Sequence, residues 1–305
     1  MHAPAYKISK YLAKQLNGYL NLEYQFNTID SSSLANELTK LKLDHNSRMV
    51  TFDIKGLYVN IPVGEKIQIT QTQLAKYNSP QITQQTITLL QAILKQNYFA
   101  FENKIYQPEK GVSMGSPISN IIAEIFLQNL EQLHMTQILD TNNIVYYTRY
   151  VNDILIIYDN TLISLETISE QINKLHPDLQ FTHTQEQDNT VNFLDLHLIR
   201  HPNTTEIDIY RKTTTTDTTI NFTSNHPTEH KLAAYRFLIH RMLSLPLSTK
   251  KKSIEWQKIM TVASNNRFPP KIITRLKTQI QQATQRKKET ENGPHSLSIA
   301  QKSGK

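Results

Sequence analysis

The sequence predicts an α+β fold in which an antiparallel sheet is backed by helices. Two observations carry this prediction. A short β-prone stretch at 48–54, RMVTFDI, ends in an acidic residue and is followed by a glycine-containing turn. A later stretch at 147–158, YTRYVNDILIIY, has two β-rich runs around Asn152 and Asp153, which is typical of a hairpin. With helical periodicity between them, we expect two strand-end acids to meet at one edge of the sheet.

The remaining elements follow from apolar periodicity and from capping signals. The apolar spacing predicts helices before, between and after the strands, and the last three helices form a continuous helical region from about residue 228. The expected elements are a serine-capped helix at 31–42, helical structure over 65–97, a helix at 163–175, strands at 179–184 and 191–199, and helices at 229–245, 251–263 and 270–289.

The segment at 111–134, GVSMGSPISNIIAEIFLQNLEQLH, has the clearest local signal. Gly111 and Gly115 indicate a flexible loop. Ser116 is a residue type that caps helices, and Pro117 is favoured at the first helical position. Apolar residues then recur on one helical face. We therefore predict a loop that ends in a helix beginning at about Ser116.

Composition limits the classes of protein that remain. The chain has 305 residues, 38% of them apolar, which is enough for a large core. It has no cysteine, so disulfides and thiolate metal sites are excluded, and no apolar run is long enough to span a membrane. Residues 231–305 carry 16 Lys and Arg against 3 Asp and Glu, whereas residues 1–230 carry 33 − 16 = 17 against 26 − 3 = 23. This asymmetry predicts a polyanion-binding C-terminal region, with a solvated lysine-rich tail as the alternative.

Several motifs, taken in order, resemble the palm of a reverse transcriptase. They are FDIKGLYVNIP, GVSMGSPISNIIAEIFL, YTRYVND and NFLDLHL. The later segment IYRKTTTTDTTINFTSNHPTEHKLAAYRFLIHR is similar to the one that follows the palm in Penelope-like retroelements. The resemblance covers about residues 5–245. It implies a polymerase palm with a truncated fingers region and a helical thumb.

The resemblance assigns roles to single residues. Asp53 matches the first metal-binding aspartate, and the carbonyl of Ile54 is expected beside the same metal. Tyr58 matches the aromatic steric gate that favours deoxynucleotides, although an aromatic that packs under a loop is the structural alternative. The residues Gly115, Ser116 and Pro117 match the loop that holds the template and the incoming base pair. Arg149 and Tyr150 precede the catalytic turn and are expected to support it, and Asp195 is interpreted as structural.

One position departs from the family pattern. The family has Tyr-x-Asp-Asp where this chain has Tyr150-Val151-Asn152-Asp153. An amide offers a carbonyl oxygen but no charge, so two divalent ions would face two carboxylates instead of three. Breaking a close charge pair costs roughly 3–5 kcal/mol, which corresponds to about 10²–10⁴ in rate. We therefore expect catalysis that depends on Asp53 and Asp153 and is impaired by Asn152.

The basic region fits the thumb of the same family. Lys231, Arg236, His240 and Arg241 lie at near-helical spacings and are expected to contact phosphates. A zinc site formed by the histidines His226, His230 and His240 is disfavoured, because no cysteine is present. The expected divisions are 1–47, a remnant of the junction between fingers and palm; 48–200, the palm; 201–289, the post-palm connection and thumb; and 290–305, a disordered tail.

Three hypotheses about the function remain. The first is an RNA-directed DNA polymerase domain of a retroelement, which uses Mg²⁺ or Mn²⁺, an RNA template, a DNA primer and deoxynucleoside triphosphates. Such a protein would be intracellular and nuclear. The second is a catalytically inactive nucleic-acid-binding remnant, which keeps the basic thumb and has lost the chemistry at Asn152. The third is an unrelated two-metal nuclease, which would need further acids around Asp53 and would have no use for the Gly-Ser-Pro loop.

Overall fold

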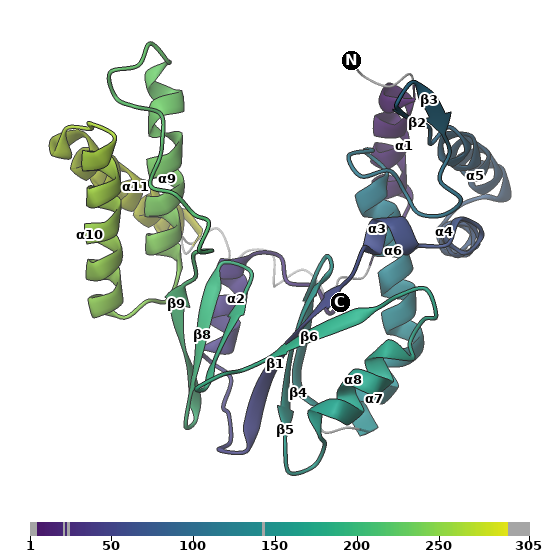
Figure 1. Cartoon of the computed structure of the whole chain (residues 1–305), viewed down its shortest axis with the longest axis horizontal. Coiled ribbons are helices and arrows are strands. Elements are labelled where there is room, and N and C mark those ends of the chain that lie inside the picture. Colours follow the sequence, from purple (N-terminus) through teal and green to yellow (C-terminus); the bar gives the residue numbers. More distant parts are fainter. Residues whose placement is uncertain (1–4, 21, 23–24, 142–143, 292–305) are drawn as a thin grey trace, which may run out of the picture. The chain divides into compact units, whose positions relative to one another are not determined.

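The computed structural model describes residues 5–20, 22, 25–141 and 144–291, and it has the predicted α+β class (Figure 1). The chain forms two compact units. The first comprises residues up to 29 together with 43–193, and the second comprises 30–42 together with the residues from 194 onward. The expected segment 1–47 is therefore divided between the two units. The expected tail at 290–305 lies, from residue 292 on, outside the described residues.

The first unit is built on a four-stranded antiparallel sheet with the order β4-β5-β1-β6. Its strands are β1 (Ser47–Ile54), β4 (Ile144–Tyr150), β5 (Asp153–Asp159) and β6 (Phe181–Gln185). Side chains alternate between the two faces of a strand, and Val50, Phe52 and Ile54 of β1 belong to one continuous apolar core. The same core includes Ile168 and Ile172 from a helix behind the sheet. The predicted strand and hairpin are confirmed.

Helices cover the core face of this sheet and extend beyond it (Figure 1). They are α1 (Tyr6–Tyr19), α3 (Leu57–Asn60), α4 (Val63–Tyr77), α5 (Pro80–Lys95), α6 (Ser119–Leu130), the π-helical turn η1 (Glu131–Met135), α7 (Thr136–Thr141) and α8 (Leu165–Asn173). The unit also contains the hairpin strands β2 (Phe99–Phe101) and β3 (Lys104–Tyr106), and the strand β7 (Thr190–Phe193). No helix among the described residues is long and apolar enough to cross a membrane.

Two details of the helices differ from the sequence expectation. The helical stretch at 65–97 is two helices, because Ser79 caps α5 and Pro80 occupies its first position, where the missing N–H is harmless. The helix expected from Ser116 begins at Ser119 instead. Residues 116–119 form a turn in which the N–H of Ser119 donates to the carbonyl of Ser116, and the Ser119 hydroxyl donates to Ser113 O at 2.6 Å. Ser116 therefore belongs to the loop rather than capping the helix.

The second unit combines a hairpin with helices. It contains α2 (Ser31–Leu38), β8 (Leu196–His201), β9 (Thr204–Ile209), α9 (Thr228–Ser244), α10 (Thr249–Asn265) and α11 (Pro270–Glu291). The cap of α2 is Asp30, which accepts from Ser33 N at 2.8 Å, and not a serine. The strand expected at 191–199 is interrupted at Leu194, whose φ of 56° is a turn conformation, so its two halves are β7 and β8.

The last three helices pack around an apolar core of their own, and their predicted existence is confirmed (Figure 1). Tyr235, Ile259 and Phe268 are buried in this core, with contributions from all three helices. The irregular segment before α9 is tied to the end of α10 by Asn266. Its side chain accepts from Thr219 N at 3.0 Å and donates to Asp217 O at 2.7 Å.

Candidate active site

The two acids that the sequence analysis singled out lie directly opposite each other. Asp53 is paired with Asp153 in the antiparallel register of β1 and β5. Side chains of directly opposed residues project to the same face of a sheet. The neighbouring residues Phe52 and Ile154 project to the other face, into the apolar core. The sheet therefore places both carboxylates together on the face away from that core.

The turn between β4 and β5 consists of only two residues, Val151 and Asn152, because Tyr150 is paired with Asp153. Val151 has a φ of 55°, which is a strained conformation for a β-branched residue. The carbonyl of Asn152 accepts from the N–H of Ile54 at 3.0 Å, which fixes the turn against the end of β1. The strained turn is therefore held in place by its neighbours, as expected where an acid must be presented at one position.

Asn152 is in direct contact with the first acid. Its side-chain nitrogen Nδ2 donates a hydrogen bond to Asp53 Oδ1 at 2.6 Å. The amide thus satisfies one oxygen of the carboxylate without bringing a positive charge. An aspartate at the same position would place a second negative charge there, and the two carboxylates would need a cation between them. This contact is the clearest chemical consequence of the asparagine.

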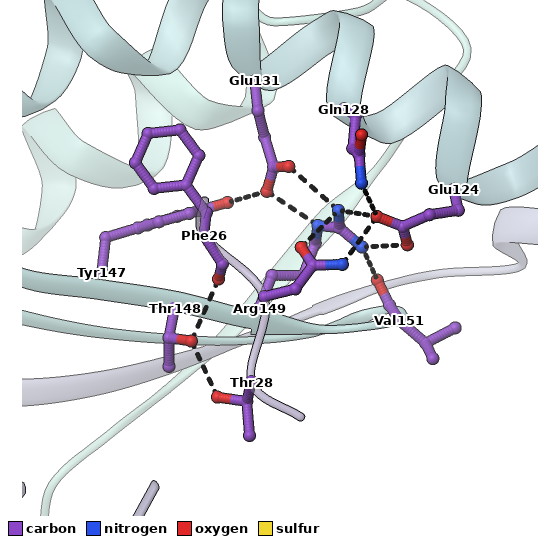
Figure 2. Close-up of polar contacts among 10 residues, drawn as sticks. Phe26, Thr28, Glu124, Gln128, Glu131, Tyr147, Thr148, Arg149 and Val151 are labelled. Carbon is purple, nitrogen blue, oxygen red and sulfur yellow. Dashed lines mark hydrogen bonds and ion pairs between the residues drawn. The ribbon is translucent and has the colours of Figure 1, made fainter. Parts of the chain in front are cut away.

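A buried ionic network supports the turn from behind (Figure 2). Arg149 of β4 is 1% exposed, and its guanidinium donates to Glu131 at 2.7 and 2.9 Å and to Glu124 at 2.9 and 3.1 Å. It also donates to the carbonyl of Val151 at 3.1 Å and to Asn27 Oδ1 at 2.9 Å. Tyr147 donates to Glu131 at 2.9 Å. The expected supporting role of Arg149 is therefore visible as a direct bond to the turn.

The network is electrostatically complete. Burial disfavours the charged form of Arg149, but hydrogen bonds and ion pairs with Glu131 and Glu124 outweigh it and raise the arginine pKa above its ordinary value. Burial likewise acts to raise the pKa of Glu124, and the hydrogen bonds and charge of Arg149 lower it below its ordinary value. Loss of one charged residue from this network would lower the stability of the fold, because removing one partner of a buried pair costs roughly 3–5 kcal/mol.

Tyr58, which matches the steric gate, is held in place by a side-chain hydrogen bond. The hydroxyl of Tyr58 donates to Asn120 Oδ1 at 2.8 Å, from α3 to α6. Partial burial, and then the negative charge of Glu124, raises the pKa of Tyr58, so its ring stays neutral at physiological pH. Tyr58, Asn120, Glu124 and Val151 line a cavity of about 270 Å³. The tyrosine is therefore oriented beside a hollow near the turn.

The loop before α6 is tied to the backbone around Tyr58. Val112 N donates to Tyr58 O at 2.6 Å, and Gly111 N donates to Ile61 O at 3.1 Å. The buried Lys66 donates to Gly111 O at 2.5 Å, and burial lowers the pKa of Lys66 to about 8. Gly111 has a φ of 86°, and a Cβ there would lie 2.7 Å from the backbone of residues 58 and 59. Only glycine fits this position.

The Gly-Ser-Pro residues lie in the next part of the loop. Gly115, with a φ of 90°, is followed by Ser116 and Pro117, and all three line a cavity of about 240 Å³ together with Tyr6 and Tyr98. Unlike Gly111, Gly115 has open space where a Cβ would stand. The loop is therefore anchored at its start and free of crowding at its glycine tip.

The four basic residues expected to contact phosphates do not form one face of α9. Lys231 donates to Phe222 O at 2.8 Å and lies over the Phe222 ring, so it stabilises the unit internally. Arg236 is paired with Glu229. His240 is exposed, and Arg241 is mostly buried, 3.7 Å from Asp195. The helical spacing was predicted correctly, but the charges point in different directions.

Asp195 has the structural role that the sequence analysis gave it. Its carboxylate accepts from the hydroxyl of Ser31 and pairs with Arg241, and its carbonyl accepts from Tyr210 N at 2.9 Å. These contacts join α2, the start of β8 and α9 within the second unit. His226, His230 and His240 form no metal cluster, and no group of three or more acids or histidines suited to a metal ion occurs in the described part of the chain.

Comparison with known proteins decides the family. The model of the reverse transcriptase (RNA-dependent DNA polymerase) family matches residues 5–196, which is more than half of the chain. The chain belongs to the reverse transcriptase family. A second model, the animal helix-turn-helix domain, matches residues 218–278, which include α9 and α10 of this reverse transcriptase chain. A search of curated proteins gives no significant match.

Solved structures confirm the fold. Telomerase from Candida albicans in complex with a fragment of telomeric RNA is similar with a TM-score of 0.56 at 12% identity, over 91% of this chain and 50% of the telomerase. Apo telomerase from Candida tropicalis gives 0.55 at 12% identity, over 90% and 53%. The chain thus spans about half the length of these telomerases. At this identity the likeness concerns the fold alone.

The donor atoms at the reverse transcriptase site can be tested against a divalent cation. Mg²⁺ prefers hard oxygen ligands, and Asp53 and Asp153 provide two carboxylates on one face. Asn152 offers a carbonyl oxygen after a rotation of its amide, but in this structure it turns its nitrogen toward Asp53. These residues can therefore hold a divalent cation, but they offer it one carboxylate ligand fewer than the family pattern does.

Sequence reasoning missed Asn120, Glu124, Glu131 and Lys66. The first three are polar positions on the helical segment after the Gly-Ser-Pro loop, and Asn120 and Glu124 are four residues apart on one face of α6. The spacing of Asn120 and Glu124 on one face of a largely buried helix was a readable signal. Their partners, Tyr58 and Arg149, are distant in sequence, so the pairing itself depends on the fold. Lys66 gave no signal, because a lysine in a helix is ordinarily exposed.

Proposed function

We propose that the chain is an RNA-directed DNA polymerase domain of a Penelope-like retroelement, impaired by Asn152. The observation that carries the proposal is the juxtaposition of Asp53 and Asp153 at a strained two-residue turn, with the amide of Asn152 bonded to Asp53. The subtype rests on the resemblance of the segment at 209–241. The expected substrates are an RNA template, a DNA primer and deoxynucleoside triphosphates, and the expected place of action is the nucleus, which a tagged chain in cells would test.

Asp53, the carbonyl of Ile54 and Asp153 would hold Mg²⁺ or Mn²⁺. Bound there, the metal would lower the pKa of the primer hydroxyl and would stabilise the leaving pyrophosphate. Tyr58, oriented by Asn120, would exclude a ribose 2′-hydroxyl. Gly115, Ser116 and Pro117 would lie against the templating base pair. Arg149 would keep the turn at the position from which Asp153 reaches the same face as Asp53.

A second function is favoured by the contact between Asn152 and Asp53. Because the amide already satisfies the carboxylate, the acid pair needs no metal to be stable, and a chain that only binds nucleic acid would keep the same fold. The basic charge of the C-terminal part supports binding without chemistry. This inactive remnant is the alternative to an impaired polymerase.

Primer extension separates the two functions. The chain and its Asn152→Asp variant are compared on an oligo(dT)–poly(rA) template with Mg²⁺ or Mn²⁺, with Asp53→Asn as a control that removes the first acid. An impaired polymerase extends the primer slowly, and the variant is faster by about 10²–10⁴, whereas Asp53→Asn is inactive. Extension by the variant alone establishes the remnant. A folded variant that does not extend any primer contradicts the polymerase proposal for this chain.

A further inference from the structure

One cavity of the second unit is not used by the proposed polymerase chemistry. It has a volume of about 570 Å³ and lies between α9, α10 and the irregular segment that precedes α9. This size is within the range of small-ligand sites in proteins, about 300–1,000 Å³. Arg211, Asp217 and three threonines of the segment at 211–219 line one side. The two helices supply mostly apolar side chains, with Gln257, Lys258 and Thr261 among them. The cavity therefore has a polar and an apolar wall.

The polar wall contains an arginine with an unsatisfied donor. Arg211 lines the cavity, and its Nη2 is held by the carboxylate of the buried Glu255. Its other terminal nitrogen, Nη1, is buried and has no hydrogen-bond partner among the described residues. An unpaired buried donor of a charged group is costly, and a turn of the guanidinium toward the cavity would let this nitrogen donate to a phosphate oxygen. Lys258 adds a second, exposed positive charge to the cavity.

The apolar wall has an aromatic ring at its rim. Phe237 of α9 is 61% exposed and Ile254 of α10 is 42% exposed, and both residues line the cavity. The guanidinium of Arg241 lies 5.3 Å from the centre of the Phe237 ring. An exposed phenylalanine gains little from packing in the free protein. A nucleobase that stacks on it would cover the exposed ring and add binding affinity.

The charge around the cavity indicates an anionic partner. Between residues 249 and 286 the chain has nine lysines and arginines and a single acid, Glu255. Glu255 is buried and paired with Arg211, so it does not offset the surface charge, whereas Asp217, which also lines the cavity, offsets part of the positive charge there. Protein–protein interfaces are depleted in lysine, whereas this surface is rich in it. The combination of basic charge, aromatic ring and orphan guanidinium donor matches a nucleotide better than a protein surface.

We propose that this cavity binds one unpaired nucleotide of a nucleic-acid strand. The base stacks on Phe237 against the apolar wall, and the adjoining phosphate is held by Arg211 and Lys258. The inference rests on the proposed nucleic-acid-binding function, and it adds to it a site for single-stranded nucleic acid that is separate from the acids of the first unit. Duplex nucleic acid, whose bases are stacked on one another, does not fill the site.

The test compares binding of a fluorescent oligothymidylate with binding of a blunt duplex of the same length, using the full chain. Phe237→Ala weakens oligothymidylate binding by about tenfold or more and leaves duplex binding within about twofold. Leu162→Ala is the control, because Leu162 is also 61% exposed and lies in the first unit. Lys258→Met weakens oligothymidylate binding more than Lys271→Met, which removes the same charge from an exposed position of α11 outside the cavity.

The possible outcomes distinguish a failure of this inference from a failure of the proposed function. If Phe237→Ala and Lys258→Met bind oligothymidylate as tightly as the unchanged chain does, the cavity is not the site and this inference is wrong, while the proposed function stands. If the unchanged chain binds neither probe, the proposed function fails and the inference fails with it. Because Phe237 is exposed, its truncation leaves the fold intact, and a thermal melt checks this. A strand with 2-aminopurine gives a direct readout, because its emission changes on stacking and the change is lost in Phe237→Ala.

Discussion

The two sides of the turn after β4 differ in how their charges are satisfied. Behind the turn, Arg149 is buried and is fully paired with Glu124, Glu131 and the carbonyl of Val151. In front of it, Asp53 is exposed and takes a hydrogen bond from a neutral amide. The support is a complete ionic network, whereas the presented group has one charge fewer than the reverse transcriptase pattern.

This difference teaches that the fold and the chemistry depend on separate residues. The network stabilises the protein, and its loss would lower the free energy of unfolding whether or not the chain is active. The acids at the turn contribute little to folding, since exposed charges gain little from their neighbours. A reverse transcriptase chain can therefore keep its fold while the ligands of its metals change, and the two sides should respond differently to mutation.

The largest effect on stability is expected from Arg149→Met. The substitution leaves Glu124 and Glu131 buried without their cation, so the free energy of unfolding falls by about 3–5 kcal/mol. Chemical denaturation monitored by circular dichroism measures it. Lys76→Met, which removes an exposed charge from α4, serves as the control and changes stability by less than about 0.5 kcal/mol. Equal effects of the two changes would show that the network contributes nothing beyond surface charge.

A matched pair of glycines tests the loop that joins Tyr58 to the Gly-Ser-Pro residues. Gly111→Ala combines a left-handed φ with a Cβ 2.7 Å from backbone atoms, so it destabilises by roughly 2–4 kcal/mol. Gly115→Ala has the same kind of φ but open space, and costs only about 1–2 kcal/mol. Thermal denaturation of both variants gives the comparison. If Gly115→Ala is the more damaging, the loop is anchored at its tip rather than at its start.

The buried Lys66 predicts a dependence of stability on pH. Its pKa is lowered to about 8 from the ordinary 10.5 by burial. Between these values the unfolded chain binds a proton that the folded chain does not, so stability rises with pH; below about 8 both states are protonated and this contribution is constant. The unfolding free energy of the unchanged chain minus that of Lys66→Met should therefore rise from pH 8 to 10.5, by at most about 1.4 kcal/mol per pH unit. A flat difference would mean that Lys66 titrates normally.

The sequence predicted the elements better than their ends. The alternation in RMVTFDI and in the hairpin at 147–158 is local and strong, and both appeared as strands with the acids in register. The helix at Ser116 and the strand across Leu194 were misplaced because the deciding factors are not local. A turn held by Ser113 and Ser119 delays the helix, and a left-handed residue ends the strand.

The candidate site was foreseeable only where motifs exist. Asp53, Asn152 and Asp153 are read from short patterns, and their mutual placement follows from strand pairing. The partners Asn120, Glu124 and Lys66 act through tertiary contacts with residues 45 to 62 positions away or with Arg149, 25 positions away, and no spacing rule reports them. On α9 the spacing of the basic residues was local and readable, but it did not indicate that Lys231 and Arg241 have internal partners, and their contacts with phosphates stay a prediction.

A small effect on folding, and the sharpest test of the comparison, is expected from Asn152→Asp. The substitution replaces a hydrogen bond to Asp53 by repulsion among three carboxylates, so without divalent ions it destabilises by about 1–2 kcal/mol at neutral pH. The loss disappears as pH falls and the carboxylates are protonated. Mg²⁺ should restore the melting temperature of the variant while leaving the unchanged chain nearly unaffected. Asp53→Asn in the same background leaves two carboxylates, so it reduces the repulsion and the response to Mg²⁺ together. If the melting temperature of the variant depends on neither pH nor Mg²⁺, these side chains do not share a site. A charge added at the front of the turn would then have no effect on stability.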